Sequence, residues 1–157
     1  MEEGESDGKR KDQQAELQSL VLTLRQYQAQ AETTSQELLA VQQAIGEHEK
    51  AIETIKYLKE QKEGDELIVP IGANSLIYVT LSATDKVIVM IGGGISAEKD
   101  PDSSVQYLTS KKAELENSHR ELAGLMQKVE QEAQKVQARL QAITSTQDGG
   151  RGASLDR

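Results

Sequence analysis

Two histidines carry the chain's only imidazole groups, so a search for catalysis or metal binding begins with them. His48 and His119 lie in different halves of the sequence, and no cluster of carboxylates accompanies either one. A catalytic or metal site needs several groups that converge on one point. The sequence has no cysteine, which excludes disulfides, thiolate metal sites and cysteine nucleophiles. We therefore expect no catalytic residue, no metal site and no enzymatic activity.

Three consecutive glycines, Gly92 to Gly94, are the other feature that could do chemistry, because glycine-rich loops can cradle phosphates. No Gly-Lys-Ser or Gly-Lys-Thr follows them, and the next segment has the composition of a strand. We favour a tight or bulged connection between two strands over nucleotide binding. No cofactor is expected.

The composition excludes further classes of function. The chain has 18 Lys and Arg against 26 Asp and Glu, a net charge of −8, which disfavours nucleic acid as a partner. It has no Phe, no Trp and only four Tyr, so a thick aromatic core cannot form. Its longest apolar runs are far shorter than the roughly 18 residues that cross a bilayer, and its acidic start is unlike a signal peptide. We expect a cytoplasmic protein that binds no membrane.

Two segments, 14–62 and 101–144, share a repeat of apolar residues at alternating spacings of three and four. Ten of twelve repeat positions are apolar in each segment. A 3.5-residue repeat held over so many heptads predicts a coiled-coil seam. The seam positions are Leu17, Leu20, Leu24, Tyr27, Ala31, Thr34, Leu38, Val41, Ile45, His48, Ile52 and Ile55, and then Val105, Leu108, Lys112, Leu115, His119, Leu122, Met126, Val129, Ala133, Val136, Leu140 and Ile143.

If the chain reverses between the two segments, the seams align antiparallel when Ile55 faces Val105. This register places the polar seam residues His48 and Lys112 opposite each other, where they could pin the register. It also places His119 opposite an apolar residue, so the alignment is a hypothesis.

The ends of the helices carry signals of their own. Gly64 suits the left-handed residue that closes a helix, and Asp100 followed by Pro101 is typical of an N-cap and a first helical position. Residues 1–13 and 145–157 have almost no large apolar side chain, so we expect disordered tails there.

The block between the helices has strand composition. Residues 66–95 include 17 apolar residues of 30, ten of them Val or Ile. Strands are predicted near 66–71, 75–81, 86–91 and 95–99, which form two hairpins within 66–99. Their apolar residues stand at consecutive positions, so both faces need covering, and pairing with other subunits would supply that. The expected interface residues are Leu67, Ile68, Val69, Ile77, Val79, Val87, Val89 and Ile91.

This organisation, and the motifs Val-Pro-Ile-Gly at 69–72 and Gly-x-Gly-x-x-x-Glu-Lys at 92–99, resemble the alpha subunit of archaeal prefoldin. The resemblance covers about residues 14–143. It implies an α+β fold, a long antiparallel coiled coil with two central β-hairpins that join an oligomeric β-barrel. It also implies an ATP-independent chaperone in which two alpha and four beta subunits assemble. Such a complex captures unfolded proteins at its coil tips and delivers them to a group II chaperonin.

The residues themselves point to the coil tip as the client site. Helix termini fray, so apolar side chains beside disordered tails could be offered to a client, and several weak tips would bind by multivalency. The predicted tip residues are Leu17, Leu20, Val21, Leu24, Val136, Leu140 and Ile143. The alternative function is a structural or filament-forming coiled-coil protein of the prefoldin type, which would share every helical feature.

Overall fold

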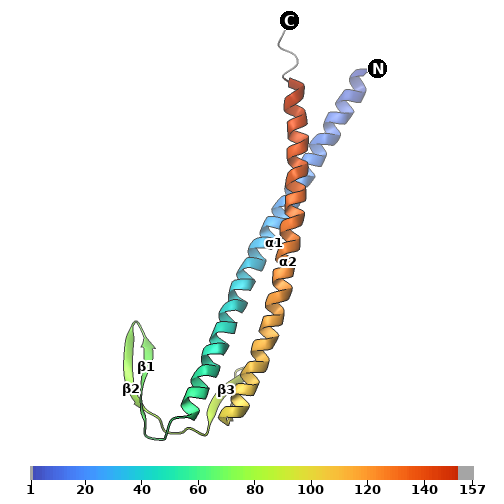
Figure 1. Ribbon diagram of the computed structural model, residues 1–157. Coiled ribbons are helices and arrows are strands. Elements are labelled where there is room, and N and C mark those ends of the chain that lie inside the picture. The colour runs from blue at the N-terminus through green and yellow to red at the C-terminus, as the bar shows by residue number, and fades with distance from the viewer. Residues whose placement is uncertain (1, 152–157) are drawn as a thin grey trace. The chain divides into compact units, whose positions relative to one another are not determined.

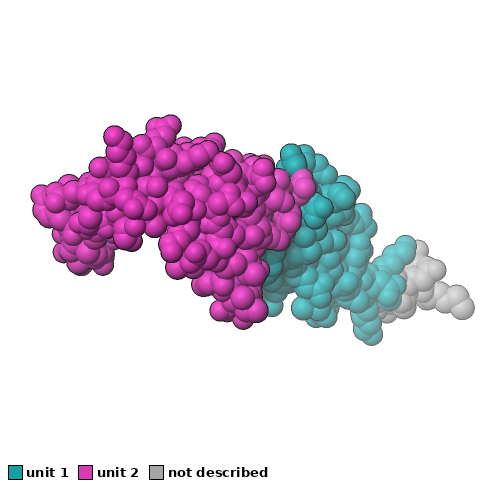
Figure 2. Space-filling view, turned by 90° about the horizontal axis from the view of Figure 1, so that it is seen from below, with its two compact units in different colours: residues 1–39, 120–157 teal, residues 40–119 magenta. Residues whose placement is uncertain are grey.

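A computed structural model describes the backbone of residues 2–151 and the side chains of residues 8–146. Two long helices enclose four strands along the chain (Figure 1). The described residues form two compact units, one of residues 40–119 and one of residues 1–39 with 120–157 (Figure 2). The elements are α1 (Glu2–Lys59), β1 (Glu66–Gly72), β2 (Ser75–Thr80), β3 (Val87–Gly92), β4 (Ile95–Lys99) and α2 (Pro101–Arg151).

In the unit of residues 40–119, α1 and α2 run antiparallel and bury their seam. Ile52 and Ile55 are 8% and 6% exposed. Ile55 and Val105 line the same small pocket, as the predicted register requires. The remaining seam positions of this unit are buried or half-buried, including both histidines. The 3.5-residue repeat therefore marks the packed face of the helices.

In the unit of residues 1–39 and 120–157, the seam is also packed. Val129, Ile143 and Thr34 are buried, and every other predicted seam position of this unit is half-buried. Arg139 and Glu16 form an ion pair between the helices, with Nη2 and Oε1 2.8 Å apart. Each of these two residues directly precedes a seam leucine, the flanking position from which coiled-coil helices exchange charges. The predicted coiled coil is confirmed in both units.

Each pair of strands is a separate antiparallel hairpin. Hairpin 1 consists of β1 and β2, and hairpin 2 of β3 and β4. Gly93 and Gly94 form the two-residue turn of hairpin 2 with φ of 59° and 76°, and a bulge precedes them at Gly92. Positive φ at both turn positions matches the right-handed twist of the strands, which explains the glycines. The prediction of a tight or bulged strand connection is confirmed.

The helix ends differ in part from expectation. α2 begins at Pro101 as predicted, and Asp100 caps it by accepting a hydrogen bond from the Ser103 N–H at 3.0 Å. α1 ends at Lys59, short of the predicted end at 62. Gly64 adopts φ of 92°, but its N–H donates to the carbonyl of Leu81, so it opens the base of hairpin 1 and does not close the helix.

The helices also continue through residues 2–13 and 145–151, where the composition predicted disordered tails. Glu, Lys, Arg and Gln in residues 2–13 are good helix formers, so the backbone there can stay helical without an apolar seam. Residues 145–151 have few such residues, and their composition does not explain the continued helix. Residues 152–157 of the expected C-terminal tail lie outside the described residues.

Candidate interaction surfaces

Hairpin 1 presents apolar side chains on both faces. Ile68 pairs with Tyr78 across the strands, and these side chains are 58% and 74% exposed. On the other face, the pair of Val69 and Ile77 is exposed as well. An isolated hairpin with two apolar faces is at best marginally stable in water. Hairpin 1 is therefore a surface that a partner sheet could cover.

Hairpin 2 presents one apolar face only. Val89 is buried and Val87 half-buried, whereas Ile88 and Met90 between and beside them are 74% and 69% exposed. Because side chains alternate between the faces of a strand, this pattern means that one face packs on the chain itself and the other faces solvent.

The predicted interface residues divide accordingly. Ile68, Val69, Ile77 and Ile91 are exposed, Leu67, Val79 and Val87 are half-buried, and Val89 is buried. The most exposed apolar side chains of the strands were not among the predicted interface residues, namely Tyr78, Ile88 and Met90. Period-two alternation was the signal that could have found them, because Ile88 and Met90 alternate with Val87 and Val89, and Tyr78 lies between Ile77 and Val79.

A second apolar surface lies on α1 in the unit of residues 1–39 and 120–157. Leu17, Gln18, Val21 and Leu22 line an open hollow with an almost wholly apolar lining. Leu22 is 60% exposed and Val21 is 39% exposed. A hollow of this kind fits an apolar side chain from another molecule.

The predicted tip residues are brought together in this unit, but most are not free. Leu17, Leu20, Leu24, Val136 and Leu140 are half-buried in the seam and Ile143 is 7% exposed. Val21 is the only predicted tip residue that the structure leaves exposed. Leu22 was not predicted, although it lies beside the seam as Val21 does, and its apolar type next to Val21 was the signal that could have found it.

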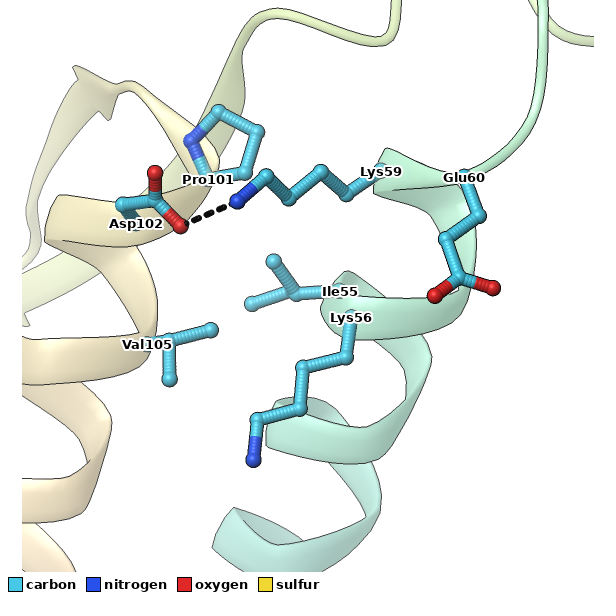
Figure 3. Close-up of a pocket in the computed structure, with 7 residues that line it drawn as sticks. All are labelled: Ile55, Lys56, Lys59, Glu60, Pro101, Asp102 and Val105. Carbon is cyan, nitrogen blue, oxygen red and sulfur yellow. Dashed lines mark hydrogen bonds and ion pairs between the residues drawn. The ribbon is translucent and has the colours of Figure 1, made fainter.

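At the hairpin end of the coil, a pocket is lined by two apolar seam residues and by charged side chains (Figure 3). Ile55 and Val105 point toward each other across it. Above them the Lys59 Nζ lies 2.7 Å from the Asp102 Oδ1, and this hydrogen bond raises the pKa of Lys59. The contact ties the end of α1 to the start of α2 across the last seam layer.

The seam histidine of α1 and the seam lysine of α2 contact different partners in the structure. His48 Nδ1 lies 2.7 Å from the carbonyl oxygen of Ala44, one turn earlier in its own helix. Lys112, predicted to face His48, binds the next residue, Glu49, with 2.9 Å between Nζ and Oε1. Among residues 8–146, no three His, Cys, Asp or Glu side chains are grouped so that they could hold a metal ion.

Comparison with known proteins shows which family this chain belongs to. The family model described as prefoldin subunit matches residues 27–146. The chain belongs to the prefoldin family. Prefoldin subunit alpha of Methanosarcina mazei is 35% identical over 132 residues, which cover 78% of this chain and 93% of that protein. Prefoldin subunit alpha of Methanothrix thermoacetophila is 34% identical over 115 residues, 73% of this chain and 75% of the relative.

A solved prefoldin structure has the same fold. The cryo-EM structure of filamentous PFD from Methanocaldococcus jannaschii matches with a TM-score of 0.63 and 25% identity, and the match covers 74% of this chain and 97% of that chain. Two long helices that enclose two hairpins are thus the prefoldin subunit fold. Prefoldins are chaperones that work as oligomeric complexes, and a chaperone-type role follows for this chain from its family. Within the described residues, no helix has the length and hydropathy to span a bilayer.

Proposed function

We propose that the protein is the alpha-type subunit of a cytoplasmic, ATP-independent holdase. Its hairpins join those of beta-type subunits, two alpha with four beta, and its coil captures unfolded proteins and delivers them to a group II chaperonin. The observation that carries the proposal is the apolar surface that the single chain leaves uncovered. Large apolar side chains are exposed on both hairpins, and on α1 the exposed Val21 and Leu22 line an apolar hollow.

The hairpin surface supports assembly. Ile68, Tyr78, Ile88 and Met90 are each more than half exposed in the single chain. Burial of such side chains is worth about 1.5–3 kcal/mol each, so a partner sheet that covered several of them would overcome much of the entropy lost on association. Unpaired strand edges on both hairpins would be satisfied by the same partner.

The hollow on α1 supports client binding. An unfolded protein exposes apolar side chains in no fixed order, so its binding site must be apolar and tolerant. The hollow of Leu17, Val21 and Leu22 is apolar and open, and Gln18, which also lines it, adds no charge. One such contact is weak, and several coils on one complex would raise the affinity through multivalency. A client held this way is released by competition for its apolar groups, with no need for nucleotide hydrolysis.

Two measurements test the proposal. Native mass spectrometry of the chain, mixed with a beta-type prefoldin subunit, should show a hexamer that contains two copies of this chain. The complex should then suppress aggregation of a chemically unfolded protein without ATP, and should pass it to a group II chaperonin for refolding. The proposal would be contradicted if the chain did not bind the beta-type subunit, or if the hexamer did not reduce aggregation of the unfolded protein.

The alternative is a filament built from this chain alone, and one observation favours it. The solved structure with the same fold is that of a filamentous PFD. Electron microscopy of the chain without a partner separates the two possibilities. Filaments that persist when a beta-type subunit is added in excess would support the alternative, and closed hexamers would support the holdase.

A further inference from the structure

The two hairpins differ in how far their own chain covers them. In hairpin 1 only Leu67 and Val79 are half-buried, and every other strand residue is exposed. In hairpin 2 burial alternates strictly at the base. Val87, Val89, Ala97 and Lys99 lie on the covered face, while Ile88, Met90, Ser96 and Glu98 are exposed. Another part of the unit of residues 40–119 therefore packs on one face of hairpin 2.

Tyr107, in the second turn of α2, meets both strands of hairpin 2. Its Oη lies 3.5 Å from the carbonyl oxygen of Ile91 in β3. The Nζ of Lys99, at the end of β4, lies 5.8 Å from the centroid of its ring. Lys111, one turn further along α2, places its own Nζ 5.9 Å from the same centroid. Figure 1 shows β3 beside the start of α2, which agrees with these contacts.

We propose that Tyr107 is a positioning residue that holds hairpin 2 on α2, so that the hairpin turns its Ile88 and Met90 face toward another subunit. Hairpin 1, exposed on both faces, is instead ordered by that subunit. The partner is a prefoldin-type hairpin whose apolar face covers these side chains. The identity of the partner as another subunit rests on the proposed function, but the role of Tyr107 does not.

The aromatic ring of Tyr107 supplies most of the interaction that holds hairpin 2 on α2, and its hydroxyl contributes little. A separation of 3.5 Å is at the long end for an O–H donor, whose preferred distance to a carbonyl is near 2.7–2.8 Å. Both lysines lie within the roughly 6 Å at which a cation is attracted to an aromatic face. The half-buried ring also packs as an apolar body. Tyr107→Phe should therefore keep the hairpin in place, and Tyr107→Leu should release it.

Hydrogen exchange of the full chain measures this directly. At a concentration at which sedimentation shows a single chain, amides of residues 87–99 should exchange more slowly than those of residues 66–80. Tyr107→Leu should raise exchange in residues 87–99 several-fold, Tyr107→Phe should not, and helix content should be unchanged in both. Tyr57→Leu is the matched control, because Tyr57 is 56% exposed on α1. Unchanged exchange in Tyr107→Leu, or an equal rise in Tyr107→Phe, would overturn the assignment.

A second measurement tests whether the partner subunit orders hairpin 1 more than hairpin 2. When a beta-type subunit is added to the wild-type chain, the gain in protection should be larger in residues 66–80 than in residues 87–99. Equal gains would overturn the assignment of hairpin 1 as the part that the partner orders. Failure of the two chains to associate would contradict the proposed assembly, while the single-chain experiment would still decide the role of Tyr107.

Discussion

Lys112 Nζ lies 2.9 Å from Glu49 Oε1 and joins α2 to α1 from a seam position. Glu116, one turn further along α2, lies 3.6 Å from the same nitrogen. The hydrogen bond to Glu49 raises the pKa of Lys112. A charged residue at a position that normally takes Leu or Ile costs stability, and it favours the one register in which it finds a partner.

Lys112→Leu should therefore raise the thermal midpoint by a few degrees. Leucine would add apolar volume to the seam. Glu49 would lose its ion-pair partner but stay hydrated, because its side chain is 51% exposed. Circular dichroism melts measure the shift. Lys128→Leu, at an exposed position of α2, controls for the change of charge. A lower midpoint for Lys112→Leu would mean that the ion pair stabilises the coil more than a leucine would.

The cap at Asp100 predicts a specific response to pH. Hydrogen bonds from Ser103 hold the pKa of Asp100 below its ordinary value of 3.8. A carboxyl with a lowered folded-state pKa stabilises the fold above its ordinary pKa, and loses that contribution as the pH falls through the folded-state value. Below about pH 4 the midpoint of the wild type should thus fall further than that of Asp100→Asn, whose cap does not titrate. Parallel melts of the two proteins at low pH would show no separation if the cap were unimportant.

Packing at the seam sets the stability of the coil. Ile52 is 8% exposed, and Ile52→Ala should lower the free energy of unfolding by about 2–4 kcal/mol through lost burial and the cavity that remains. Leu39 is 65% exposed, so Leu39→Ala should change it by less than about 0.5 kcal/mol. Urea unfolding at one fixed protein concentration gives both values. Similar losses in the two variants would show that the seam is not the main source of stability.

The seam and the strands could be predicted from the sequence, whereas the burial of Val89 and the helical backbone of residues 2–13 were not. The seam followed from local periodicity alone, and the structure buries or half-buries every predicted position. The strands followed from their content of Val and Ile, with ends that differ by a single residue at most. Burial of Val89 could not be predicted, because it depends on tertiary packing that no local pattern encodes. The helical backbone of residues 2–13 was missed because the prediction weighed packing above helix propensity.

The exposed faces of the hairpins should control assembly. Ile68→Lys with Ile88→Lys would place two charges where a partner sheet is expected, and an unpaired buried charge is strongly destabilising. The oligomer should dissociate at concentrations at which the wild type assembles, while the helical signal in circular dichroism persists. Native mass spectrometry reports the assembly.

The control for this pair carries the same chemical change on the coil. Leu39 and Leu125 are also exposed, and Leu39→Lys with Leu125→Lys should leave the oligomer intact. If the oligomers of both double variants dissociated, the change in net charge would explain the dissociation. The hairpin faces would then not be shown to control assembly.

Client capture should depend on the exposed hollow of α1 more than on the seam beneath it. Val21→Ser with Leu22→Ser removes the exposed apolar atoms and leaves the packed residues Leu20 and Leu24 in place. Because several tips act together, a modest loss at each one multiplies across the complex. The concentration of complex that half-suppresses aggregation of an unfolded protein without ATP should rise by about tenfold or more.

Leu39→Ser provides the comparison, since Leu39 is more exposed than Leu22 but lies outside the hollow. Its complex should suppress aggregation as the wild type does. If the double variant also retained full suppression with an intact oligomer, the client would have to reach seam residues through local opening of the helices. Leu20→Ser would then reduce capture where Val21→Ser with Leu22→Ser did not, and the hollow would be an ordinary feature of the coil surface.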